Sequence, residues 1–314
     1  MKSTIVSRRK DTVVIVSAIA AVVSVILRII NFFFFYDSEA VYYSTGAPLP
    51  IISDCLMYGS VLYLAFFSVL KFKKKTLKAA DSPLALRICS IAVATASFVM
   101  LTVTDLIDAA TQKAPLSVLF AALSLISAAY FVLAIFKTNV AYTIICGILA
   151  IIRVVIMLAS SYFNQSVAMN TPDKLIYGVA CICVMLFIVS ELKLTVKAPR
   201  SWLYVFSAAA TAIICSTASI PSIIAYFTGK LPEESGLFSE YFVLMGIAIY
   251  AMIRLINVSG ETRRMGLVSD IKSELTSEGT PDSEVCSEDT VSGAEAESST
   301  SDESDISVNT DSEQ

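Results

Sequence analysis

Two arginines inside long apolar stretches are the residues with the clearest chemical potential. Arg28 and Arg153 each stand well within an apolar run. A guanidinium offers N–H donors in a planar fork that matches a carboxylate or a phosphate, and burying it near a bilayer centre costs about 2.5–3.5 kcal/mol. We expect either that both contact a solute in an internal cavity, or that they reach the headgroups or pair with carboxylates such as Asp54 and Asp105.

Four further residues join the two arginines as candidate ligand-binding residues. Tyr58 and Tyr177 occupy matching positions of an internal repeat, described below. Asp54 and Asp105 are carboxylates near the ends of apolar runs, where solvation costs little, and a carboxylate can carry a proton or a cation. The hypothesis is that all six side chains contribute to one solute site.

Hydroxyl-bearing residues recur at helical spacing in two of the apolar runs. Ser97 and Thr104 belong to one run, and Thr211 and Ser219 belong to another that is rich in small residues. Such stripes let helices approach closely and hydrogen-bond across the contact. They can also line a polar path for a solute, and the sequence leaves both interpretations open.

Residues for catalysis or metal binding are scarce. The chain has no His and seven Cys, which removes His general bases, Ser-His and Cys-His pairs and most zinc sites. Six of the Cys lie in apolar runs, where packing is their expected role. Cys181 and Cys183 lack the two-residue spacing of a metal or redox pair. We expect no enzymatic activity, no catalytic residue, no metal and no cofactor.

The composition indicates that helices in a lipid bilayer position these residues. Of 314 residues, 56% are hydrophobic and 16% are charged, and the mean hydropathy is +0.73. A soluble domain is usually about 45–50% apolar and about 25% charged. Because a soluble core cannot hide this much apolar surface, the lipid bilayer is the expected partner. The sequence predicts an all-α integral membrane protein.

Eight apolar runs are long enough, or nearly so, to cross the hydrocarbon layer as helices. They lack the alternation of barrel strands, and the first has no small-residue cleavage site, so we expect it to be retained. Glu191, just beyond the sixth run, is expected at the membrane interface. The predicted spans are 13–36, 51–70, 85–106, 116–136, 140–163, 175–190, 202–227 and 241–257.

Lys and Arg residues gather in alternate connections between these spans. The basic segment 1–12 and the connection at 71–78 are the richest in cations. Cations favour the cytoplasmic side, so we predict a multi-pass protein of the plasma membrane with both termini in the cytoplasm. Because the cations flank apolar spans, they are topology signals, and no nucleic-acid partner is expected.

The two halves of the membrane region resemble each other. Tyr58-Gly59 matches Tyr177-Gly178 at an offset of 119, and 27–30 matches 152–155 at an offset of 125. Since each half contains an even number of helices, the halves have the same orientation, as in parallel repeats about an axis along the membrane normal. The alternative is a chance likeness of apolar sequences. The predicted four-helix repeats are 13–136 and 137–257.

The C-terminal region differs from the rest in charge. Thirteen acidic residues and no Lys or Arg lie in 273–314. Since the whole chain has a net charge of −4 and the tail carries −13, the first 272 residues carry the difference, +9. We expect a short amphipathic cytoplasmic segment at 258–276 and a disordered, acidic, Ser-rich tail at 277–314. The tail either solvates the protein or docks a cytoplasmic protein partner.

Two functions are consistent with this sequence. The first is a transporter or carrier of a small solute, anionic if the arginines bind it, at the interface of the two repeats. The second is a non-catalytic membrane sensor, regulator or assembly partner that acts through the acidic tail. Architecture alone does not separate them.

Overall fold

Long helices make up nearly all of the described chain. The structure is a computed structural model and describes residues 2–37, 42–43, 47–72, 84–112, 115–133, 140–163, 171–196, 201–229 and 238–277. The elements are α1 (Lys2–Phe34), β1 (Tyr36–Asp37), β2 (Tyr42–Tyr43), α2 (Pro48–Phe72), α3 (Leu84–Gln112), α4 (Pro115–Leu133), α5 (Val140–Phe163), α6 (Pro172–Thr195), α7 (Ser201–Phe227) and α8 (Phe238–Ser277).

All eight predicted spans are confirmed as helices. Within the described residues, eight helical segments are long and apolar enough to cross a membrane, from Thr12–Phe34 to Phe238–Asn257. The sixth span, predicted as the short run 175–190, is a helix of 24 residues, because the polar residues at both of its ends are helical too. The fold fits a multi-pass membrane protein.

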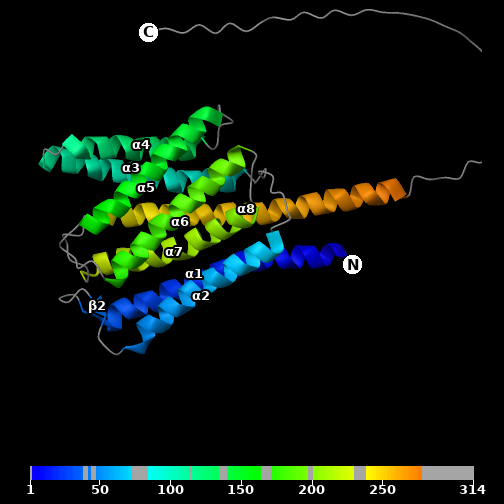
Figure 1. The fold of residues 1–314 in the computed structure, drawn as a ribbon, viewed down its shortest axis with the longest axis horizontal. Coiled ribbons are helices and arrows are strands. Elements are labelled where there is room, and N and C mark those ends of the chain that lie inside the picture. The colour runs from blue at the N-terminus through cyan, green and yellow to red at the C-terminus, as the bar shows by residue number, and fades with distance from the viewer. Residues whose placement is uncertain are drawn as a thin grey trace, which may run out of the picture. The chain divides into compact units, whose positions relative to one another are not determined.

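Successive helices run in alternating directions through the bundle (Figure 1). The β1–β2 pair, in which Tyr36 lies opposite Tyr43, connects α1 to α2 at one end, called here the hairpin end. The odd-numbered helices finish at the hairpin end and the even-numbered helices begin there (Figure 1). The start of α1 and the finish of the last membrane span therefore lie at the opposite end, as an even number of crossings requires.

Helix α7 is the most deeply buried of the spans. It packs against α1, α2 and α6, while α4 joins α3 to α5, and α5 packs against α6. Small residues allow this close packing. Helix α8 also approaches its neighbour closely at a small residue, Gly246. A Cβ added to Gly246 would lie only 2.4 Å from the Ser97 hydroxyl of α3, which is too close for a normal contact.

The predicted repeats are only partly mirrored in the packing. The pairs α1–α2 and α5–α6 are equivalent under the predicted repeat, and each pair packs side by side. The third helices have different neighbours, because α3 lies against α4 whereas α7 lies against α1, α2 and α6. The repeat relation between 13–136 and 137–257 stays a prediction.

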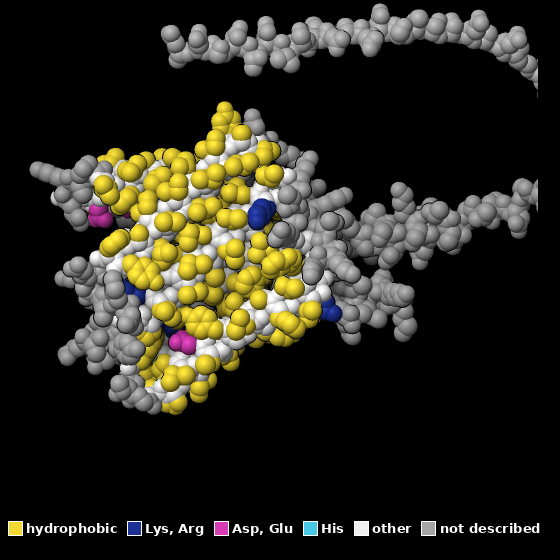
Figure 2. Space-filling model, in the orientation of Figure 1, with side chains coloured by type: hydrophobic (Ala, Val, Ile, Leu, Met, Phe, Trp, Pro, Cys, Tyr) yellow, Lys and Arg dark blue, Asp and Glu magenta, His cyan; other side chains and the backbone are white. Residues whose placement is uncertain are grey.

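Hydrophobic side chains cover the described helices on the face shown in Figure 2, and charged side chains are few there. Since lipid tails solvate apolar side chains, this surface suits a bilayer. The acidic tail from 278 onward lies outside the described residues. The predicted segment 258–276 belongs to the α8 helix by its backbone, and its side chains are outside the described residues as well.

Candidate functional site

Arg28 lies near the hairpin end of α1 and joins three helices. Its exposed fraction is only 2%. One terminal nitrogen donates to the Asp173 carboxylate of α6 at 2.5 Å, and the other lies 3.7 Å from the Asp54 carboxylate of α2. The structure thus contains the Arg28–Asp54 pair that the sequence suggested and adds a closer partner, Asp173.

The buried face of α1 explains how Arg28 reaches this position. Ser17, Ser24 and Asn31 follow a spacing of seven residues and are all buried together with Arg28. Residues at this spacing share one side of a helix, and that side of α1 faces α2 and α7. Arg28 therefore points into the protein and not toward lipid.

Arg28, Asp54, Asp173 and the polar side chains near them are called here the Arg28 cluster. Many buried polar atoms of this cluster have no hydrogen-bond partner. Buried polar groups in proteins are nearly always paired, and an unpaired one costs about 1–3 kcal/mol. The unpaired atoms are Arg28 Nε, Asn31 Oδ1, Asp173 Oδ2, Thr171 Oγ1 and the hydroxyls of Tyr36, Tyr43 and Tyr58. They offer donors and acceptors together, which is what a polar ligand needs.

Aromatic side chains from the hairpin cover this cluster. The rings of Phe32, Tyr36 and Tyr43 lie 4.9–6.2 Å apart between centroids. The Tyr36 hydroxyl lies beside the Asp173 carboxylate but completes no hydrogen bond. Burial raises the pKa of both the Tyr36 and Tyr43 hydroxyls above the ordinary value. Both therefore remain O–H donors at neutral pH.

The charges of the Arg28 cluster do not balance. One guanidinium faces two carboxylates, Asp54 and Asp173. If all three groups are ionised, the cluster carries a net charge of −1. The anionic preference suggested by Arg28 alone is therefore offset by its own partners, and the balance favours a positively charged group.

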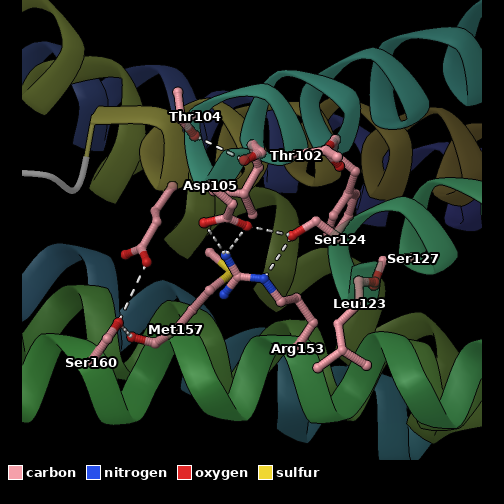
Figure 3. Close-up of polar contacts among 12 residues, drawn as sticks. Thr102, Thr104, Asp105, Leu123, Ser124, Ser127, Arg153, Met157 and Ser160 are labelled. Carbon is pink, nitrogen blue, oxygen red and sulfur yellow. Dashed lines mark hydrogen bonds and ion pairs between the residues drawn. The ribbon is translucent and has the colours of Figure 1, made fainter. Parts of the chain in front are cut away.

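Arg153 of α5 forms a second cluster, none of whose atoms is among the unpaired buried polar atoms of the described chain (Figure 3). Its Nη2 lies 2.9 Å from the Asp105 carboxylate of α3, and its Nε donates to the Ser124 hydroxyl of α4 at 2.7 Å. Ser124 in turn donates to Asp105 at 3.0 Å. Three helices are thus joined by a closed triangle of hydrogen bonds, and the predicted Arg153–Asp105 pairing is present.

The two predicted tyrosines have different surroundings. Tyr177 of α6 donates to the Glu240 carboxylate of α8 at 2.5 Å. The Ser160 hydroxyl of α5 lies 3.5 Å from the same carboxylate, but its proton has a closer acceptor in the Met157 carbonyl at 2.9 Å. The hydroxyl of Tyr58 has no partner, although it lies close to Asp54. The six predicted site residues therefore fall into two groups, with Arg28, Asp54 and Tyr58 in one and Arg153 and Asp105 in the other; Tyr177 belongs to neither directly.

A third cluster corrects the expectation for Glu191. The sequence placed Glu191 at the membrane interface, but its exposed fraction is 4%. It pairs with Arg254 of α8 at 2.7 Å and accepts hydrogen bonds from Tyr250 at 3.0 Å and Tyr130 at 3.4 Å. The guanidinium of Arg254 offsets the cost of burying the Glu191 charge. A hydropathy profile does not show this pairing, because it does not show which helices lie together.

Comparison with known proteins adds no relative. No family model, curated protein or solved structure matches the chain. Any functional conclusion must therefore come from the geometry itself.

The hydroxyls of the predicted polar path donate hydrogen bonds to backbone carbonyls. Ser97, Thr104 and Ser219 donate to carbonyls of their own helices. Thr211 of α7 donates across to the Cys183 carbonyl of α6 at 3.0 Å. These contacts favour close packing at these four positions, and the path through them stays a prediction.

Sequence reasoning missed Asp173, Glu240 and Ser124. A signal for Asp173 was present, because it stands 119 residues after Asp54, the offset that relates Tyr177 to Tyr58. Glu240 and Ser124 carry no such signal. Among the described residues, no group of three or more His, Cys, Asp or Glu side chains is placed to hold a metal ion.

Proposed function

We propose that the protein is a membrane carrier whose solute site is the Arg28 cluster. The observation that carries this proposal is the set of unpaired buried polar atoms around Arg28 and Asp173. A structure that keeps such atoms unpaired forfeits stability. A polar solute with donors and acceptors would complete their hydrogen bonds, so binding would recover that free energy.

The chemical class of the solute follows from the charges. Two carboxylates against one guanidinium favour a solute with an ammonium or similar cationic group. The rings of Phe32, Tyr36 and Tyr43 lie beside these charges, and aromatic faces attract cations. We therefore propose a small solute that carries a positive charge and at least one hydrogen-bonding group.

Further unpaired hydroxyls extend the site along the helices. Ser17 and Ser24 of α1 and Ser68 of α2 are fully buried, and none of their oxygens has a hydrogen-bond partner. A Ser in a helix usually finds a backbone carbonyl, as Ser97 does. We propose that the contact between α1 and α2 is the route by which a solute leaves the Arg28 cluster.

The orientation belongs to the same proposal. The basic N-terminal segment forms the start of α1, and the connection at 71–78 comes at the finish of α2. Both of these helix ends lie opposite the hairpin end. Because cations favour the cytoplasmic side, the hairpin end would face outward from the plasma membrane. The Arg28 cluster, close to that end, would then load solute from outside.

Ligand-dependent thermal stabilisation tests the proposal. The full chain in lipid nanodiscs would be heated with ethylammonium, choline or glycine, and with acetate or inorganic phosphate as anionic probes. We expect at least one ammonium probe to raise the unfolding temperature of the wild type. Asp173→Asn should abolish that shift, because it removes a negative charge and the unpaired Asp173 Oδ2 acceptor.

Tyr142→Phe is the matched control, since Tyr142 is exposed on α5 and should not affect binding. Stabilisation of the wild type and Asp173→Asn by equal amounts would contradict the site. A response to no ammonium probe, or to the anions alone, would contradict the proposed solute class.

A further inference from the structure

Glu240 is a buried carboxylate that has no ion-pair partner among the residues that the structure describes. Its exposed fraction is 7%. The other well-buried carboxylates of the described chain each pair with an Arg: Asp105 with Arg153, Asp173 with Arg28 and Glu191 with Arg254. No Lys or Arg nitrogen described in the structure lies within ion-pair distance of Glu240.

Two hydroxyls and a helix terminus surround this carboxylate. Tyr177 donates at 2.5 Å, and the Ser160 hydroxyl lies 3.5 Å away while it donates to the Met157 carbonyl at 2.9 Å. Glu240 lies in the first turn of α8, where the helix dipole favours negative charge. Burial in an apolar medium without a counter-ion favours the neutral acid. The opposing influences leave both protonation states accessible, which a permanently paired carboxylate does not allow.

The charged and titratable neighbours of Glu240 come from several helices. Arg153 and Asp105 act on it through space as an already neutralised pair, and Cys181 of α6 and Tyr241 of α8 lie nearby. None of these contributes an ion pair to the Glu240 carboxylate. A proton is therefore the simplest species that can neutralise its charge.

Tyr177 connects Glu240 to the Arg28 cluster. Asp173 and Tyr177 are four residues apart on α6, so they share one face of the helix. The ring of Tyr241 meets that of Tyr177 edge-on at 5.7 Å between centroids and lies near both Asp173 and Arg28. A change at Glu240 thus acts directly on the helix face that carries Asp173.

We propose that Glu240 is a proton-binding site, and that its protonation state sets the solute affinity of the Arg28 cluster. Proton binding forms one O–H bond on the Glu240 carboxylate, and release breaks that bond and returns the proton to water at the hairpin end. No electron is transferred. The coupling to solute rests on the proposed carrier function, whereas proton binding itself does not.

Infrared difference spectroscopy on the full chain in nanodiscs tests proton binding without any solute. In a titration from acidic to alkaline pH, the wild type should show a carboxylic-acid C=O band that disappears as the proton leaves. Glu240→Gln should lack this band. Tyr177→Phe keeps the carboxyl and removes its hydrogen bond, so the band should persist at a higher frequency.

Tyr177→Phe also covers a failure of Glu240→Gln to fold. Absence of a titrating acid band from the wild type would overturn the proposal, and so would persistence of that band in folded Glu240→Gln. An unshifted band in Tyr177→Phe would assign it to another carboxyl, with the same consequence.

Solute binding measured at several pH values tests the coupling. The ammonium probe that stabilises the wild type should do so to a pH-dependent extent, and Glu240→Gln should make its affinity independent of pH. Unchanged pH dependence in Glu240→Gln would overturn the coupling. A titrating band in a protein that binds no probe would leave the proton site standing and remove the carrier function.

Discussion

The clusters around Arg28 and Arg153 start from arginines that match in the predicted repeat, and they differ in how many of their buried polar atoms are paired. Both arginines are 2% exposed, and each has carboxylate partners on other helices. Arg153, Asp105 and Ser124 close a triangle in which each side chain hydrogen-bonds to both of the others. Around Arg28, by contrast, polar atoms outnumber their partners.

This difference separates a structural role from a ligand-binding one. A buried charge among mutually hydrogen-bonded partners holds helices together, and it leaves few donors or acceptors for a solute. A buried charge among unpaired atoms stabilises helix packing less, and its free donors and acceptors can bind a solute. The sequence predicted the same role for the two arginines. The number of unpaired polar atoms around each one distinguishes them.

Arg153→Ala should cause the largest loss of stability. It leaves Asp105 as an uncompensated buried charge and opens the junction of α3, α4 and α5, at a cost of about 3–5 kcal/mol. Thermal or denaturant unfolding in nanodiscs would measure it. A loss no larger than that of Arg28→Ala would break the comparison.

Arg28→Ala should cost somewhat less, toward the lower end of the same range of about 3–5 kcal/mol. It leaves Asp173 without its guanidinium, much as Arg153→Ala leaves Asp105. Arg28→Ala breaks no bond to a serine and removes the unpaired Arg28 Nε, whereas Arg153→Ala also breaks the bond to Ser124. Solute binding, however, should be lost. If Arg28→Ala retained the ammonium-dependent thermal shift of the wild type, the cluster would not be the site.

Ser124→Ala should cost about 1 kcal/mol, because Arg153 Nε and Asp105 each lose one hydrogen bond. Ser127→Ala is the matched control on the same helix, since the Ser127 hydroxyl serves only the Leu123 carbonyl of α4. We expect the control to cost less in the same unfolding assay. Equal losses would show that Ser124 does not support the triangle.

Tyr58→Phe should have the smallest effect on stability, within about 0.5 kcal/mol. Its hydroxyl is buried without a partner, so removing it forfeits no hydrogen bond, but it should weaken solute binding. Tyr177→Phe, the control at the position that matches Tyr58 in the predicted repeat, removes the bond to Glu240 and should be more destabilising. The reverse order would contradict the assignment of unpaired atoms.

The spans could be predicted from sequence because apolar length alone decides them. The pairings with Asp54 and Asp105 followed from the few carboxylates near the same membrane depth. Contacts between helices distant in sequence could not be predicted, because they depend on which helices lie together in the fold. The offset from Asp54 could have pointed to Asp173 as a site residue, but not to its contact with Arg28 between α6 and α1.

One cause accounts for the carboxylates that sequence reasoning missed or misplaced. The predicted sixth span began at 175 and ended at 190, and the eighth began at 241. Asp173, Glu191 and Glu240 each stand just outside these limits, because an apolar run is drawn to stop at the first charge. The helices continue through all three residues, which places the charges inside the protein.

The packing of α1 against later helices has a consequence for synthesis. Arg28 and Asp173 are 145 residues apart, so a ribosome adding about 5–20 residues per second needs roughly 7–29 seconds to deliver the second after the first. Of the two carboxylates that pair with Arg28, only Asp54 is then present, and it is the one that accompanies the guanidinium through insertion.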